Sequence, residues 1–339
     1  MIDERKHMDK SLIADIHRLP AEEAWPKIFS ALWPLFAEPI RQDLADAKTT
    51  ERDRAIKPLD DVLAGSAWDL WASFESASPK TADALKAFWQ RQTTPKAILI
   101  LDALSLREAP WILESAQQRG YTVHSAGATA SELPGDTTPF ARAMGFGQRT
   151  RLQNNQGNSA AFPEAFTEST DLPWVDCASL IKADPNIIFW HHWPDERMHH
   201  LAEQGAGYRV LAKEAAAVLT GDEFWAFIDK LATGRRLVIT ADHGYSNPAL
   251  FPDVYPEDQK AYLKGQFKSG RNSEVKDAKA EQHWVPPLSQ VLTTQHGNWN
   301  IVLGRKKWRS QGGYPSLAHG GLSLLEVAVP FIELSKQNN

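Results

Sequence analysis

The chain has 339 residues, 42% of them hydrophobic and 23% charged, which is ordinary for a globular protein long enough for two domains. The formal net charge of -5 argues against a surface built mainly for nucleic-acid phosphates, and a single cysteine, Cys177, excludes an internal disulfide and cysteine-rich zinc modules. No segment resembles a signal peptide or approaches the ~20 apolar residues of a membrane span, so we expect a cytoplasmic protein without a membrane partner.

Residues 1–94 are expected to form an N-terminal helical region. Apolar residues recur three and four apart in AEEAWPKIFSALWPLFAEPI and in TADALKAFWQ, with breaks expected near Pro58 and around Pro79. Many of the 13 tryptophans, such as Trp71 and Trp89, fall in these patterns. Their spacing favours core packing or a partner-binding face over ligand stacking.

Strands and helices alternate after residue 95. The segment 96–104, KAILILDAL, is a near-continuous aliphatic run, typical of a strand buried on both faces of a parallel sheet. Further strands are expected at 121–127, 174–178, 186–192, 236–244, 299–304 and 327–334. The alternation predicts a doubly wound α/β sheet with helices on both faces.

Two polar stretches interrupt this pattern, at about 143–170 and 247–297. Loops this long are more often caps or binding loops than idle connections. We therefore expect residues 95–339 to form one α/β domain with a cap insertion at about 247–297.

Metal-binding residue types follow two of the expected strands. Asp102 ends the first strand, and Asp242 and His243 end a later one within TADHG. Doubly wound sheets place their reactive groups at the carboxyl ends of the strands. Taken alone, Asp102 is explained as well by a helix cap or a turn, and the Asp-His pair by a loop.

Three further candidates lie outside the strands. Asp195 and His199 in PDERMHH are four residues apart, which places both on one face of a helix, and His319 lies in AHGG before the last strand. Each alone fits a solvated helix face or a turn. The consistent order of all six residues favours a metal site, and carboxylates with imidazoles suit zinc, and less well manganese.

The order aspartate, nucleophile, Asp-x-x-x-His, Asp-His, His resembles the metal-binding framework of the alkaline phosphatase superfamily. The closing AHGGLSLLEVAVPFIEL is similar to the C-terminal signature of PglZ domains, and NWNIVLGRKKWRSQGGYP also looks PglZ-like. The likeness covers residues 96–335 and not the N-terminal helices. It implies an alkaline-phosphatase-like catalytic domain that hydrolyses phosphate esters with two divalent metal ions.

The nucleophile is expected in ELPGDTTPFARAMG. Pro134-x-x-Thr137-x-Pro139 resembles the nucleophile turn of the phosphodiesterases in this superfamily, and the helix that follows would favour a bound phosphoryl group at its N-terminus. Thr138 is the rival. Ser105 lies too close to the first aspartate for the family pattern and more plausibly caps the next helix.

The resemblance also implies how the ligands divide. One ion would be held by Asp102, Thr137, Asp242 and His243, and the other by Asp195, His199 and His319. His191, His192 and His200 would lie behind these ligands or on the surface.

Threonine with a flanking proline fits phosphodiesterases best among the activities of the superfamily. Cys177 does not fit the sulfatase turn, and the large insertion of phosphoglycerate mutases is missing between Asp102 and Thr137. The PglZ likeness implies a nucleotide or oligonucleotide phosphodiesterase in a bacterial phage-defence or signalling system, with partner proteins at the N-terminal helices. The alternative is a non-catalytic PglZ-fold scaffold within a defence complex.

A preference for phosphodiesters over monoesters is expected from the charges near Thr137. The sequence offers no basic residue closer than Arg142, and Asp136 would repel a dianion more than a monoanion. Arg271 and Trp308 in and after the cap could hold the second substituent, although a solvated basic loop explains this region equally well. The other basic residues there are Lys268, Arg305, Lys306, Lys307 and Arg309.

Overall fold

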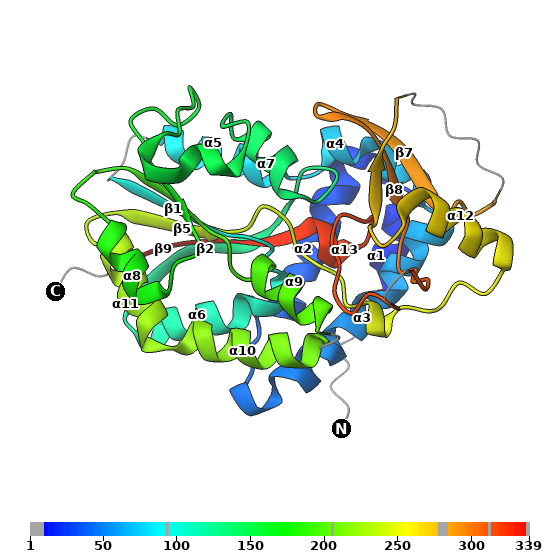
Figure 1. Cartoon of the computed structure of the whole chain (residues 1–339), viewed down its shortest axis with the longest axis horizontal. Coiled ribbons are helices and arrows are strands. Elements are labelled where there is room, and N and C mark those ends of the chain that lie inside the picture. The colour runs from blue at the N-terminus through cyan, green and yellow to red at the C-terminus, as the bar shows by residue number, and fades with distance from the viewer. Residues whose placement is uncertain (1–9, 92–94, 205–206, 277–283, 311–312, 337–339) are drawn as a thin grey trace.

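A six-stranded sheet forms the centre of the molecule (Figure 1). The computed structural model describes residues 10–91, 95–204, 207–276, 284–310 and 313–336. The spatial order of the strands is β2-β9-β5-β1-β4-β3, and all run parallel except β9, which is antiparallel to both its neighbours. Their bounds are β1 Lys96–Leu101, β2 Tyr121–Ala130, β3 Phe166–Thr170, β4 Ile187–His191, β5 Arg236–Thr240 and β9 Ala328–Lys336.

Helices cover both faces of this sheet, which confirms the predicted fold class. The aliphatic strand β1 shows why: Leu99 and Leu101 pack into the core on one face, whereas Ile98 and Ile100 pack into the core on the other. The first face is covered by α6 Ala109–Gln118, α8 Trp174–Leu180, α9 Asp195–Glu203, α10 Tyr208–Thr220 and α11 Asp222–Ala232. The second face is covered by α5 Thr81–Gln90 and α7 Thr137–Ala143.

Two strand predictions were wrong in this core. Residues 174–178 belong to helix α8, because Pro173 at its N-cap and Asp176 in its first turn favour a helix start and only Cys177 is fully buried. Strand β3 lies in a stretch expected to be a loop, because its sequence FTEST is polar. Segment 149–157 covers this strand, and the Thr167 hydroxyl accepts the Gly157 N–H at 3.0 Å.

The N-terminal residues 10–91 are mainly helical, with helices α1 Lys10–Ile16, α2 Ala21–Ala37, α3 Ala45–Gly65, α4 Phe74–Ala77 and α5. Four of their aromatic side chains, Trp25, Phe29, Trp71 and Phe74, pack against one another in the core, as the tryptophan spacing predicted. The predicted break near Pro58 was wrong, because α3 continues through it. Pro58 is exposed, so water can satisfy the carbonyl that its missing N–H leaves free.

The segment predicted as a cap holds helix α12 Glu257–Phe267 and a small sheet in the order β6-β8-β7. Its strands are β6 Asn272–Glu274, β7 Ser289–Thr294 and β8 Gly297–Val302, so the strand expected at 299–304 belongs here and not to the central sheet. Leu292 of β7 and Ile301 of β8 share a core with the N-terminal helices and with α13 Leu324–Val327.

The domain limits remain predictions. Most of the opening MIDERKHMDK, the limit near residue 94 and residues 277–283 of the proposed cap lie outside the described residues. Among the helices in the described ranges, none is long and apolar enough to cross a membrane.

Candidate metal centre

Asp102, Asp242 and His243 meet at one edge of the central sheet. Strands β1 and β5 are parallel neighbours, so the residues that follow them leave the sheet at the same edge. Asp242 Oδ1 accepts the Ala103 N–H at 3.0 Å, and His243 Nε2 lies 3.6 Å from Asp102 Oδ1 and 3.5 Å from Asp242 Oδ2. All three side chains are fully buried.

Thr137 faces this first group. It is the first residue of α7, and its Oγ1 lies 3.4 Å from Asp102 Oδ1. Thr138 is exposed, whereas Thr137 is half-buried. Ser105 caps the next turn as predicted: its buried hydroxyl accepts from the Arg107 N–H and forms a capping box with Glu108. The geometry therefore favours Thr137 over both rivals.

A second group lies beside the first. His199 Nε2 is 3.4 Å from Asp195 Oδ2, across one turn of α9, and His319 Nε2 is 3.8 Å from Asp195 Oδ1. The rings of His319 and His243 stack with centroids 4.4 Å apart. Ligand atoms of Asp102, Asp195 and His243 also lie within 4.8 Å of one another. The seven predicted ligands thus lie in one region, although their binding of metal remains a prediction.

The unpaired polar atoms of the site fit a cation. Asp242 Oδ2, Asp195 Oδ1 and His243 Nε2 are buried and find no hydrogen-bond partner among the residues that the structure describes. Buried polar atoms in native proteins are rarely left unpaired. Carboxylate oxygens and imidazole nitrogens at these spacings are the donors that zinc takes.

The electrostatics support the same conclusion. Burial, followed by the charges of Asp242 and Asp195, raises the pKa of Asp102 well above its usual range, and burial raises the pKa of Asp242 to about 7. Burial opposes ionisation of Asp195, yet the His199 hydrogen bond and the nearby histidines lower its pKa. Without cations the site therefore resists full ionisation, and bound divalent ions would remove that conflict.

Arg149 is a cation of this site that the sequence analysis missed. Its Nη1 pairs with Asp102 Oδ2, and the other oxygen of the same carboxylate, Oδ1, lies near Thr137 Oγ1. Arg142 was expected to be the basic residue nearest Thr137, but it is exposed, whereas Arg149 pairs with the carboxylate that lies next to Thr137. Arg149 lies in a polar stretch without periodicity, 47 residues after Asp102, and no sequence motif links the two residues. Their pairing could therefore not be predicted.

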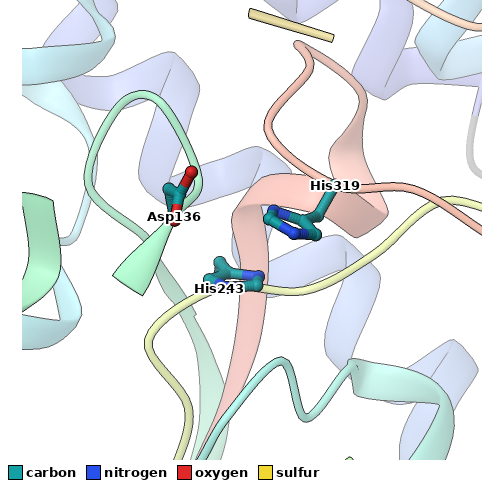
Figure 2. Close-up of side chains that lie close together, drawn as sticks. All are labelled: Asp136, His243 and His319. Carbon is teal, nitrogen blue, oxygen red and sulfur yellow. The ribbon is translucent and has the colours of Figure 1, made fainter. Parts of the chain in front are cut away.

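Asp136 also lies closer to the site than expected. Its Oδ1 caps α7 by accepting the Thr137 N–H at 2.8 Å. Ligand atoms of Asp136, His243 and His319 lie within 4.8 Å of one another, and Figure 2 shows the three side chains on three different loops. Asp136 is thus a further candidate ligand. Its position directly before the predicted nucleophile was the available signal.

A cavity of about 570 Å³ opens beside the second group. His199, His319 and Asp136 line it together with residues of the predicted cap, Ser310 and residues 313–318. The cavity thus adjoins the candidate ligands and is large enough to admit a small molecule.

Arg271 borders this cavity, but its guanidinium is already engaged. Nε pairs with Glu326 at 2.6 Å, and the other two nitrogens donate to the carbonyls of Gly304 and Lys306 at 2.9 Å. A role in substrate binding remains a prediction and would need these bonds to open. Trp308 is buried, and its indole donates to the Lys268 carbonyl.

The remaining histidines of the 191–200 segment take supporting positions. His191 Nε2 lies 2.9 Å from the Leu172 carbonyl, and burial lowers its pKa to about 4. His192 Nε2 lies 3.1 Å from the Ser169 hydroxyl, and His200 is exposed.

No family model and no curated protein matches this chain. Solved structures of murine ectonucleotide pyrophosphatase/phosphodiesterase 5 are similar to it. The inactive form in complex with AMP shares 9% identity over 72% of this chain and 88% of that chain, with a TM-score of 0.45. Another structure of the same protein shares 11% identity with the same coverage and TM-score. A likeness of this degree assigns neither family nor activity, and the PglZ resemblance remains a prediction.

Proposed function

We propose that the protein is a metal-dependent phosphodiesterase that uses Thr137 as its nucleophile. The observation that carries this proposal is the convergence of seven candidate ligands in which buried carboxylate and imidazole atoms lack partners in the described structure. One ion would be held by Asp102, Thr137, Asp242 and His243, and the other by Asp195, His199 and His319. Asp136 is a further candidate donor, near His243 of the first set and His319 of the second.

The chain's own residues suit an in-line displacement. Bound divalent ions would lower the pKa of the Thr137 hydroxyl and offset charge on the reacting phosphate. The Thr137 oxygen would attack phosphorus while the alcohol on the opposite side leaves with the hydroxyl proton, which gives a phosphodiester between Thr137 and the retained substituent. Water would then cleave the bond from phosphorus to Thr137, release a phosphomonoester and restore the Thr137 hydroxyl. The cavity beside His199 and His319 would hold one substituent of the diester.

Arg149 would hold a non-bridging phosphoryl oxygen in this reaction. Asp102 presents Oδ1 to Thr137 and His243 and Oδ2 to Arg149, so one carboxylate orients the cation and remains free to bind metal. A guanidinium held in this way is preorganised for an oxyanion.

Replacing Arg149 with methionine is expected to lower kcat/KM by about 10²-fold, which corresponds to ~2.7 kcal/mol of transition-state stabilisation. Metal content should stay near wild type, and inorganic phosphate should inhibit more weakly. Arg151→Met, at an exposed position two residues on, is the matched control. An unchanged kcat/KM for Arg149→Met would show that the ion pair with Asp102 has no part in the reaction.

The proposed activity predicts about two bound metal ions per chain and a preference for diesters. Arg149 already shares its charge with Asp102, so it offers less compensation to a dianionic monoester than to a monoanionic diester, and Asp136 beside Thr137 would repel a dianion more strongly unless it binds metal. We expect a higher kcat/KM for bis-p-nitrophenyl phosphate than for p-nitrophenyl phosphate at one pH and metal concentration. A monoester preference above about tenfold, ~1.4 kcal/mol, would contradict it.

Metal analysis separates this proposal from its alternative. A non-catalytic scaffold has no reason to retain two ions, so a purified chain without bound metal and without turnover would favour the scaffold. Cyclic dinucleotides and short oligonucleotides added to the same assay would identify the substrate class. The proposed place in a bacterial defence or signalling system, with partners at the N-terminal helices, rests on the PglZ resemblance alone.

A further inference from the structure

Helix α3 carries two buried aspartates, Asp53 and Asp60, each 1% exposed. Burying a carboxylate costs several kcal/mol unless charged or hydrogen-bonding groups compensate it. The groups that compensate Asp53 and Asp60 belong to residues outside α3. We propose that α3, which supplies no predicted ligand, positions the loops that carry the ligands. This inference rests on the proposed function, because the loops matter to it only as holders of metal ions.

Asp53 is connected to the loop that follows Asp242 and His243. Arg107 uses Nη2 to pair with Asp53 and donates from Nη1 to the Tyr245 carbonyl at 2.7 Å. The Tyr245 hydroxyl in turn donates to Glu108 at 2.6 Å, beside Arg107. The chain two residues after His243 is therefore held by its backbone and its side chain, and the cation that holds it depends on Asp53.

Asp60 is connected to the loop that carries His319. Its Oδ1 accepts the Leu324 N–H at 2.8 Å, at the first residue of α13. In α13, Glu326 accepts the N–H of Gly321 at 2.9 Å, two residues after His319. A short chain of buried hydrogen bonds thus runs from α3 through α13 to this candidate ligand.

The loop before Thr137 also meets α13. The Gly244 N–H donates to the Glu326 carbonyl at 3.0 Å, and a Cβ added at Gly135 would lie 3.1 Å from the same oxygen. His319 Nδ1 lies 3.2 Å from the Gly135 carbonyl. The three loops around residues 135, 244 and 320 are therefore packed about α13, and α3 holds α13 in place through Asp60.

Arg305 joins the two aspartates. Its Nε donates to Asp60 Oδ2 at 2.7 Å, and its Nη1 lies 2.7 Å from Asp53 Oδ1. Two carboxylates, Asp53 and Asp60, thus meet two guanidiniums, Arg107 and Arg305, and the formal charges cancel. Removing one charge leaves a buried partner uncompensated, which makes the network sensitive to single substitutions.

The test compares Asp60→Asn with Asp61→Asn. The amide keeps an acceptor for the Leu324 N–H but removes the charge that Arg305 needs, whereas Asp61 is half exposed and pairs with Lys57 on the helix surface. Zinc affinity is measured by competition with a chromophoric chelator, alongside the melting temperature of the metal-free protein. We expect at least tenfold weaker zinc binding for Asp60→Asn, and less than twofold change for Asp61→Asn.

Amide hydrogen exchange of the metal-free protein distinguishes a positioning role of α3 from a purely structural one, because it reports on the individual loops. Asp60→Asn should speed amide exchange at Gly321 and Leu324, and Asp53→Asn should speed exchange in the 242–246 loop and lower kcat more than it raises KM. If both variants melt at lower temperature but keep wild-type zinc affinity and wild-type exchange in these loops, α3 is structural support only and the inference is wrong.

The two proposals fail in different ways. A wild-type chain that binds no zinc and hydrolyses no diester overturns the proposed function, and with it the role of α3 in metal binding. A wild type that binds zinc and turns over, together with an unaffected Asp60→Asn, overturns the inference alone. If Asp60→Asn does not fold, Asp53→Asn decides: unchanged zinc affinity in that variant counts against the inference.

Discussion

Replacing Thr137 with alanine is expected to lower kcat for diester hydrolysis by about 10³- to 10⁵-fold, because the attacking oxygen is lost while the rest of the site remains. Metal content should fall little, since Asp102, Asp242 and His243 still surround the first position. Rapid-quench assays and elemental analysis of the same preparation measure the two quantities.

Thr138→Ala is the matched control, because Thr138 is the neighbouring threonine and points to solvent. It should leave kcat within a few-fold of wild type. Abolished turnover in Ser105→Ala together with retained turnover in Thr137→Ala would place the nucleophile on the other turn, despite the capping bonds that Ser105 makes in the structure.

Replacing Asp242 with asparagine is expected to have opposite effects on activity and on the stability of the metal-free protein. The amide can still accept the Ala103 N–H but lacks the charge that a metal ion requires. Losing several kcal/mol of metal-supplied stabilisation corresponds to a kcat/KM roughly 10³-fold lower. The metal-free variant should nevertheless unfold at a higher temperature than metal-free wild type.

The sign of the stability effect follows from the pKa of Asp242. Burial raises this pKa from 3.8 to about 7 in the folded chain. Between these values the folded state holds a proton that the unfolded state has released, so stability falls as the pH rises through this window. Above it the carboxylate costs on the order of 2–4 kcal/mol. The melting-temperature gain of Asp242→Asn should therefore be largest near neutral pH and small near about pH 4.

Asp176→Asn, at an exposed position in α8, controls for the removal of one negative charge. A metal-free Asp242→Asn that melts below wild type at neutral pH would mean that the carboxylate stabilises the fold without a metal ion. The interpretation of the buried carboxylates Asp102 and Asp242 as part of a prepared cation site would then be wrong.

The sequence allowed prediction of the aliphatic strands of the central sheet, though not of the polar strand β3, and of the residues at its edge, because these depend on local patterns. The aliphatic run of β1 indicates burial on both faces. Asp102 follows this run and must therefore lie at the carboxyl-terminal edge of the parallel strands. The spacing of Asp195 and His199 needs only the geometry of one helical turn.

Arg149 and Asp136 could not be predicted in the same way. The pairing of Arg149 with Asp102 depends on the path of a polar segment without periodicity, and Asp136 reaches His243 and His319 only because three loops fold around α13. The buried aspartates of α3, in contrast, can be recognised from their spacing in the sequence. Asp53 and Asp60 continue the buried stripe of Ile56 and Leu63, where the helical spacing calls for apolar side chains.

Strand β9 lies between β5 and β2, and β2 has no other neighbour in the described part of the sheet. During synthesis, a chain that has emerged only as far as α12 lacks His319, α13 and β9. Its strand β2 cannot yet join the sheet, and its second candidate metal position lacks one of three ligands. Under the proposed function, a chain interrupted before β9 would lack both the complete sheet and a complete second ligand set, so we expect it to show no diester hydrolysis.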